Sequence, residues 1–168
     1  MSKKLSMSPD MSYMLGLCSL GKDEPSISAV SRSDEVIERF VRMALGEFGI
    51  DPQKIVVTET EDGLKKVLFY HSTAKRLMMR ALDEREHIFK YKNEYAASYL
   101  AGLFDARGHG SPRGIIAGVR DMVDIIIMTR LGFRVSRAGR VQNANDYLKF
   151  ITPYSATLKN APPRQRRA

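Results

Sequence analysis

The sequence predicts a mixed α/β (α+β) protein in which one order of elements (helix, strand, helix, hairpin, helix) occurs twice. Helix start signals and core-facing apolar stripes alternate with short runs of β-branched residues. The 168 residues, 43% of them hydrophobic, suffice for one core shared by two small halves. Residues of matching type also recur in register, such as Asp34 with Asp121 and Tyr70 with Tyr154.

The first predicted half, residues 1–90, begins with a helix that starts at Ser8 and Pro9, an N-cap and a first-turn proline. We expect this helix to run to about Gly21 and a strand to follow at 26–30. A second helix begins near Ser33, because its apolar residues recur at helical spacing.

Two further elements complete this half. Residues 55–60 and 64–71 are predicted to pair as a hairpin, with Asp62 and Gly63 at its turn. A third helix is expected to start at Ser72, since apolar residues line one side of the segment that follows it.

The second predicted half, residues 91–160, repeats this order. The predicted elements are a helix at 94–107, a strand at 114–119, a helix at 121–131, a hairpin at 133–152 around Ala138–Gly139 and a helix after Ser155. Residues 161–168 form a basic C-terminal tail.

Charge is unevenly distributed along the chain. Residues 1–90 carry 14 basic and 14 acidic side chains, whereas residues 91–168 carry 13 basic and 5 acidic ones. Most of the basic residues in the second half are arginines, whose planar fork matches phosphate groups and guanine edges. This distribution favours a polyanionic partner over a general solubilising role.

Several classes of protein are excluded by composition. The single cysteine, Cys18, leaves no intramolecular disulfide, and no spacing of histidines and cysteines resembles a zinc motif. The longest apolar run, 125–128, is far shorter than the roughly 20 residues that span a bilayer. With no apolar stretch behind the basic N-terminus, we expect a cytoplasmic protein that contacts no membrane.

Two segments carry a family resemblance. Residues 100–108 read LAGLFDARG, which resembles the LAGLIDADG motif of homing endonucleases at seven of nine positions. Residues 14–22 read MLGLCSLGK and keep the central Gly-Leu of that motif within a similar apolar frame. The matching order of elements extends the resemblance over most of the chain.

The resemblance implies a duplicated fold with two pseudo-symmetric halves, central paired helices and a saddle-shaped antiparallel sheet over duplex DNA. The small residues Gly16, Ala101 and Gly102 would let the paired helices approach closely. Hairpins 55–70 and 134–150 would then lie in the major groove. One chain with internal pseudo-two-fold symmetry needs no second copy, so a monomer is expected.

The residue types in these hairpins fit nucleic-acid contacts, since arginine pairs with guanine or phosphate and Gln or Asn with adenine. The second hairpin supplies most of them: Arg134, Arg137, Arg140, Gln142, Asn143, Asn145 and Lys149. The first supplies Lys54, Lys65 and Lys66, diluted by Glu59, Glu61 and Asp62. We therefore expect the second half to bind the nucleic acid more strongly.

Cleavage in the family requires an acidic residue at the eighth motif position, where carboxylates hold the metal ions that activate water. This chain has Gly21 and Arg107 at the two equivalent positions, and neither ligates Mg²⁺. Asp105, Asp23 and Glu24 are the nearest carboxylates that an atypical active site could use. Arg107 would instead attract a phosphate without metal.

These observations leave three hypotheses. The first is a protein that binds DNA, or structured RNA, through its saddle without cleavage and needs no cofactor. The second is an active Mg²⁺-dependent endonuclease with an atypical carboxylate set. The third is a structural or protein-interaction module whose basic half contacts an acidic protein.

Overall fold

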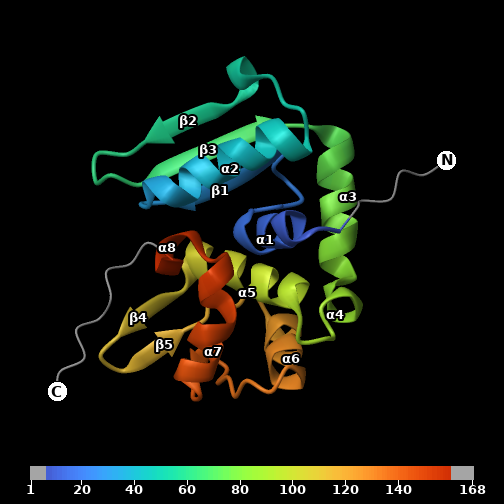
Figure 1. The fold of residues 1–168 in the computed structure, drawn as a ribbon. Helices are drawn as coiled ribbons and strands as arrows, with labels where there is room; N and C mark the ends of the chain where they lie inside the picture. Colours follow the sequence, from blue (N-terminus) through green and yellow to red (C-terminus); the bar gives the residue numbers. More distant parts are fainter. Residues whose placement is uncertain (1–6, 160–168) are drawn as a thin grey trace.

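The computed structural model describes residues 7–159, which form a mixed α/β architecture with two three-stranded antiparallel sheets. Two central helices, α1 (Pro9–Leu17) and α5 (Glu94–Arg107), pack against each other between these sheets (Figure 1). The predicted fold class is therefore confirmed. The predicted basic tail, 161–168, lies outside the described residues.

The first sheet forms as its sequence pattern predicts. Its strands are β1 (Ser26–Ser31), β2 (Val56–Glu59) and β3 (Lys65–Tyr70), in the order β1-β3-β2. Helix α2 (Asp34–Glu47) packs on the face that carries the buried β1 and β3 side chains, and the short helix η1 (Pro52–Lys54) precedes β2. The predicted turn closes the β2–β3 hairpin, where Gly63 has a φ of 82°.

The second sheet is smaller. Its strands are β4 (His109–Ser111), β5 (Gly114–Ile116) and β6 (Arg140–Val141), in the order β4-β5-β6. The predicted strand 114–119 is thus correct in place but ends earlier. Strand β4 was not predicted, because three residues without an apolar side chain carry no strand pattern.

The predicted hairpin at 133–152 is wrong beyond Gln142. Its turn exists, since Ser136 N donates to Arg140 O at 2.9 Å and Gly139 has a φ of 82°. Residues after it form helix α7 (Ala144–Ile151). Tyr147 and Ile151 lie one helical turn apart and are both fully buried, so burying an apolar helical stripe outweighs the polar pattern that indicated strands.

The first helix ends at Leu17 and not near Gly21 as predicted. After Cys18 the chain is extended, and Ser19 N donates to Ser28 O at 2.7 Å, which places this segment beside β1. The guanidinium of Arg120 donates to the carbonyl oxygens of Leu15, Gly16 and Cys18 at 2.7, 3.0 and 2.6 Å. A long-range cap therefore ends the helix.

The remaining helices connect and flank the sheets. They are α3 (Ser72–Asp83), α4 (Arg85–Ile88), α6 (Met122–Arg130), η2 (Thr152–Tyr154) and α8 (Ala156–Lys159). Helix α3 runs along one side of the molecule from the first sheet towards α4 and α6 (Figure 1). Among the described residues no helix has both the length and the hydropathy that crossing a membrane requires.

A buried polar network joins α4, α5 and α6. Arg85, on α4, forms ion pairs with Asp124 at 2.9 Å and with Asp121 at 2.5 Å. The hydroxyl of Tyr99, on α5, donates to the same Asp124 oxygen at 2.5 Å. Because Asp124 is completely buried, these partners compensate the cost of desolvating its charge.

Candidate nucleic-acid interface

Two glycines allow α1 and α5 to approach each other at backbone distance. A Cβ placed on Gly16 would lie 2.2 Å from Tyr99 O, and one on Gly102 would lie 2.2 Å from Tyr13 O. Ala101, beside Gly102, is completely buried. The three residues expected at a helix interface therefore all lie in the region where the central helices cross.

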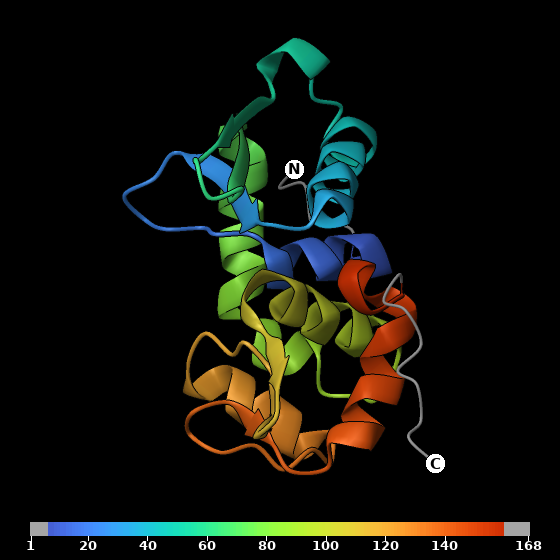
Figure 2. The same ribbon diagram turned by 90° about the vertical axis from the view of Figure 1, so that its left-hand side faces the viewer.

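The strands and three of the helices lie on different sides of the molecule. Figure 2 shows α2, α7 and α8 along one side, here called the helix side, and the strands of both sheets on the opposite, strand side. The C-terminal ends of α1 and α5 both lie on the strand side (Figure 2). The β2–β3 and β4–β5 hairpins project from the same edge of the molecule (Figure 1).

The first sheet presents a face with little charge. Cross-strand partners share a face, so Lys66 lies between Val30 and Thr58 on the face opposite α2. Tyr70, 61% exposed, and Val56, 44% exposed, lie on that same face. Predicted binding residue Lys66 is thus surrounded by uncharged side chains.

The other two lysines of this region lie apart from Lys66. Lys65 points to the opposite face and forms an ion pair with Asp34 at the start of α2. Lys54 is exposed on η1, before β2. At the turn of the hairpin, Asp62 pairs with Arg32 at 2.8 Å, which neutralises part of its acidic charge.

The second sheet and its loops expose arginines. His109, Ile116 and Arg140 are cross-strand partners on the face opposite the buried β5 and β6 side chains. Arg134 and Arg137 are exposed in the segment that leads into β6. The structure therefore brings three of the predicted arginines into one short hairpin.

Arg113 joins this group and was missed by sequence reasoning. It lies exposed in the turn between β4 and β5. Arg140 packs near this turn, since its aliphatic carbons lie 3.9 Å from a Cβ placed on Gly114. The proline and glycine on either side of Arg113 are a turn signal that could have identified the hairpin.

The structure separates the other predicted contact residues from this hairpin. Asn143 accepts from Arg134 N at 3.0 Å and donates to Gly132 O at 3.1 Å, which closes the loop before α7. Asn145 and Lys149 are exposed on α7, on the helix side (Figure 2). Gln142 is exposed at the end of the hairpin.

The Asp105 carboxylate is engaged in hydrogen bonds within the core. It accepts from Tyr13 Oη at 2.6 Å, from Ser155 Oγ at 2.5 Å, from Ala156 N at 2.7 Å and from Thr157 Oγ1 at 2.7 Å. Burial and the adjacent carboxylate raise the pKa of Tyr13 far above its usual range, so its hydroxyl stays a donor. Asp105 therefore attaches the C-terminal helix to the central pair.

The other carboxylates considered for catalysis lie in the loop after α1. Asp23 and Glu24 are exposed there, and Gly21 O accepts from Lys75 Nζ at 2.7 Å. Over residues 7–159 no three His, Cys, Asp or Glu side chains are grouped so that they could hold a metal ion. The residues at the ends of α1 and α5 therefore do not fit a Mg²⁺ site, which requires carboxylate oxygens.

Arginine side chains lie at the ends of α1 and α5. Arg107, the last residue of α5, is exposed and its Nε donates to Gly118 O at 3.4 Å. Partial burial, and then the positive charge of Arg120, lower the pKa of Arg107. The carbonyl oxygen of Cys18 accepts from Arg120 at 2.6 Å, and the Cys18 thiol is buried.

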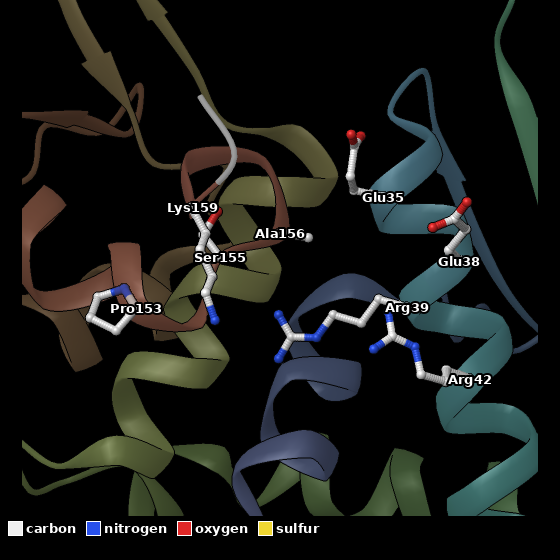
Figure 3. Close-up of a pocket in the computed structure, with 8 residues that line it drawn as sticks. All are labelled: Glu35, Glu38, Arg39, Arg42, Pro153, Ser155, Ala156 and Lys159. Carbon is white, nitrogen blue, oxygen red and sulfur yellow. The ribbon is translucent and has the colours of Figure 1, made fainter. Parts of the chain in front are cut away.

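A charged pocket of 420 Å³ lies between α2 and α8, and its lining comprises Glu35, Glu38, Arg39, Arg42, Pro153, Ser155, Ala156 and Lys159 (Figure 3). Arg39 extends from α2 towards Ser155 and Lys159. It donates to Tyr154 O and its guanidinium carbon lies 3.7 Å from the centre of the Tyr13 ring. This arginine therefore holds α1, α2 and η2 together, away from the strand side.

Comparisons with known proteins show the fold. No family model matches the chain, and no curated protein matches it. A structure of mesophilic variants of the homing endonuclease I-DmoI has a TM-score of 0.62 and 15% sequence identity, covering 92% of this chain and 98% of that chain. The complex of I-DmoI with DNA and Mn has a TM-score of 0.59 and 13% identity, covering 94% and 100%.

Proposed function

We propose that this chain binds duplex DNA along its strand side and does not hydrolyse it. The observation that carries the proposal is that Arg107 and Arg120 lie where the two central helices end, and that the described residues group no carboxylates there for a metal ion. Two guanidinium groups attract a phosphate backbone and repel divalent cations. The I-DmoI structures with bound DNA support a duplex as the partner of this fold.

The distribution of charge supports a complex in which the second sheet binds the duplex more strongly than the first. The exposed arginines of the β4–β5 turn and of the 134–140 hairpin would bind phosphates or guanines of one half of the duplex. The face of the first sheet that carries Lys66, with Val56 and Tyr70 exposed, would contribute contacts to base edges, such as thymine methyl groups. We propose that a single chain spans both halves of the target as a monomer.

Binding is tested by fluorescence anisotropy with a labelled duplex over a range of salt concentrations. The logarithm of the binding constant should fall linearly with the logarithm of salt concentration, with a slope of about 0.9 per phosphate contacted. Substituting Arg137 and Arg140 by Ala should weaken binding and reduce the slope by up to about 1.8. The control is Arg42→Ala, an exposed residue on the helix side.

Three outcomes separate the alternatives. Nicking or double-strand cleavage of the bound duplex in Mg²⁺ or Mn²⁺ would show an active nuclease and contradict the non-hydrolytic proposal. Tighter binding to structured RNA of the same length would identify RNA as the partner. Absence of binding to either nucleic acid at low salt would favour a protein-interaction role.

A further inference from the structure

One short loop contacts the ends of both central helices. Gly118 packs on the last turn of α5, where a Cβ on it would lie 2.6 Å from Leu103 O and from Gly108 N. Two residues later, Arg120 donates from Nη2 to three carbonyl oxygens at the end of α1. The loop 117–120 therefore sets how far apart the two helix ends lie.

The same loop carries one guanidinium group, that of Arg120, and accepts a hydrogen bond from a second, that of Arg107. Arg120 extends to the end of α1, while Arg107, at the end of α5, donates back to Gly118 O at 3.4 Å. Within residues 7–159 neither arginine forms an ion pair with an acidic side chain. The buried Asp124 carboxylate accepts from the backbone N–H of Arg120 and not from its guanidinium, and it is itself paired with Arg85.

The charges at this position do not cancel. Each helix C-terminus carries roughly half a negative charge, so the two ends together offset about one of the two positive charges. The Arg85–Asp124 pair adds no net charge, whereas Asp121, the second partner of Arg85, adds one negative charge on a side chain that is 55% exposed and therefore screened by solvent. The two arginines and the two helix ends thus leave about one unit of positive charge between the two sheets, before the screened charge of Asp121 is added.

The arginines also keep donors that the fold does not use. In the described part of the chain, Arg120 Nη1 and both Nη atoms of Arg107 make no hydrogen bond. Arg120 Nε is buried and also has no partner. Terminal guanidinium nitrogens of this kind are suited to bidentate contacts with phosphate oxygens.

We infer that Arg107 and Arg120 form a subsite that binds one phosphodiester group of DNA at the junction of the two sheets without a divalent cation. This inference depends on the proposed DNA binding and adds that a single phosphodiester group is bound, with a separate function for each of the two arginines. Arg120 has two functions in it, because one amino group caps α1 and the other faces the phosphate. Arg107 contributes its two Nη atoms to the phosphate, while its Nε donates to Gly118 O.

The experiment compares wild type with Arg107→Gln and Arg107→Glu, using Arg42→Gln as the matched control on the helix side. Affinity for a labelled duplex is measured in EDTA and in Mg²⁺ at equal ionic strength. In EDTA, Arg107→Gln should bind about tenfold more weakly than wild type, with a salt slope lower by about 0.9. Arg107→Glu should lose more, and Arg42→Gln should match wild type.

A second readout observes the groups directly. In the ¹⁵N-labelled protein, the Nε resonance of Arg107 is assigned by its loss in Arg107→Gln, and that of Arg120 by its loss in Arg120→Lys. Both resonances should shift on addition of a duplex in EDTA, and an Nε resonance of Arg42 should not.

Each result has a distinct meaning. Wild-type affinity and slope in Arg107→Gln, while wild type itself binds DNA, would overturn the phosphate subsite and leave DNA binding intact. Binding that disappears in EDTA and returns with Mg²⁺ would also overturn it, because the phosphate would then be held through metal. No binding by wild type would overturn the proposed function and, with it, this inference.

Discussion

The contact between the central helices makes a prediction about Gly16. Alanine at this position would place its Cβ 2.2 Å from Tyr99 O and 2.7 Å from Leu103 N. Both neighbours are backbone atoms, so no side-chain rotation can relieve the overlap. Ordinary van der Waals contact begins near 3.4 Å, and the helices would have to separate by about 1 Å to reach it.

That separation would loosen the packing of the most buried part of the molecule. Overpacking a well-packed core typically costs about 1–3 kcal/mol, and rigid neighbours place Gly16→Ala at the upper end, at about 3 kcal/mol. For a domain of this size that corresponds to a fall in Tm of roughly 6–12 °C. Gly102→Ala should cost a similar amount, since its Cβ would lie 2.2 Å from Tyr13 O.

The matched control is Gly46→Ala, near the end of α2. A Cβ on Gly46 has no atom within 4 Å, so alanine there should raise the free energy of unfolding by about 0.5–1 kcal/mol through helix propensity. Urea unfolding followed by circular dichroism measures all three variants. Losses below about 1 kcal/mol in Gly16→Ala and Gly102→Ala would refute the close approach of the two helices.

Three further predictions concern buried polar groups. Asp105→Ala removes the acceptor of four hydrogen bonds and should lower the free energy of unfolding by about 3–5 kcal/mol in urea, whereas exposed Asp23→Ala should change it by less than about 0.5 kcal/mol. Arg85→Ala leaves the completely buried Asp124 carboxylate without its cation and should cost about 3–5 kcal/mol in the same assay; a loss below 1 kcal/mol would contradict the network. Burial raises the pKa of the Cys18 thiol to about 12, so this thiol stays neutral at pH 8 and should react with a disulfide reagent only after unfolding; rapid reaction of the native protein would show that it is accessible.

Local signals predicted much of the fold. Helix α5 has the predicted bounds, because Asn93 caps its start through hydrogen bonds to Tyr95 N and Ala96 N and Gly108 ends it. The β2–β3 hairpin follows from a run of β-branched residues, 55–58, before an Asp-Gly turn. Both elements are determined by residues within a few positions of one another.

Non-local contacts explain the failures. The end of α1 depends on Arg120, more than 100 residues away along the chain, so no pattern near Leu17 could reveal it. Helix α7 depends on packing of Tyr147 against Phe104 of α5, with ring centres 6.5 Å apart. A segment whose polar residues also fit a hairpin is helical because this contact buries its apolar side.

In the candidate site, too, local sequence predicted some features and non-local contacts determine the others. Sequence indicated which residue types could contact nucleic acid, and the 134–140 arginines do share one exposed hairpin. It did not indicate that Lys65 would pair with Asp34, or that Asn145 and Lys149 would lie on a helix. Partners and facing directions follow from the tertiary fold and not from composition.

The common direction of the two central helices determines how charge at their ends affects DNA binding. Because α1 and α5 both end on the strand side, their negative dipole ends converge there, and a carboxylate at this position would add repulsion unless a divalent cation neutralised it. Arg107 and Arg120 remove the need for a divalent cation. Their positive charges stabilise the negative helix ends and would attract a phosphate without metal. Affinity for DNA should consequently depend strongly on monovalent salt and, at constant ionic strength, not on Mg²⁺. A nuclease built on carboxylates would show the opposite dependence on the divalent ion, so this comparison separates the two chemistries without knowledge of the target sequence.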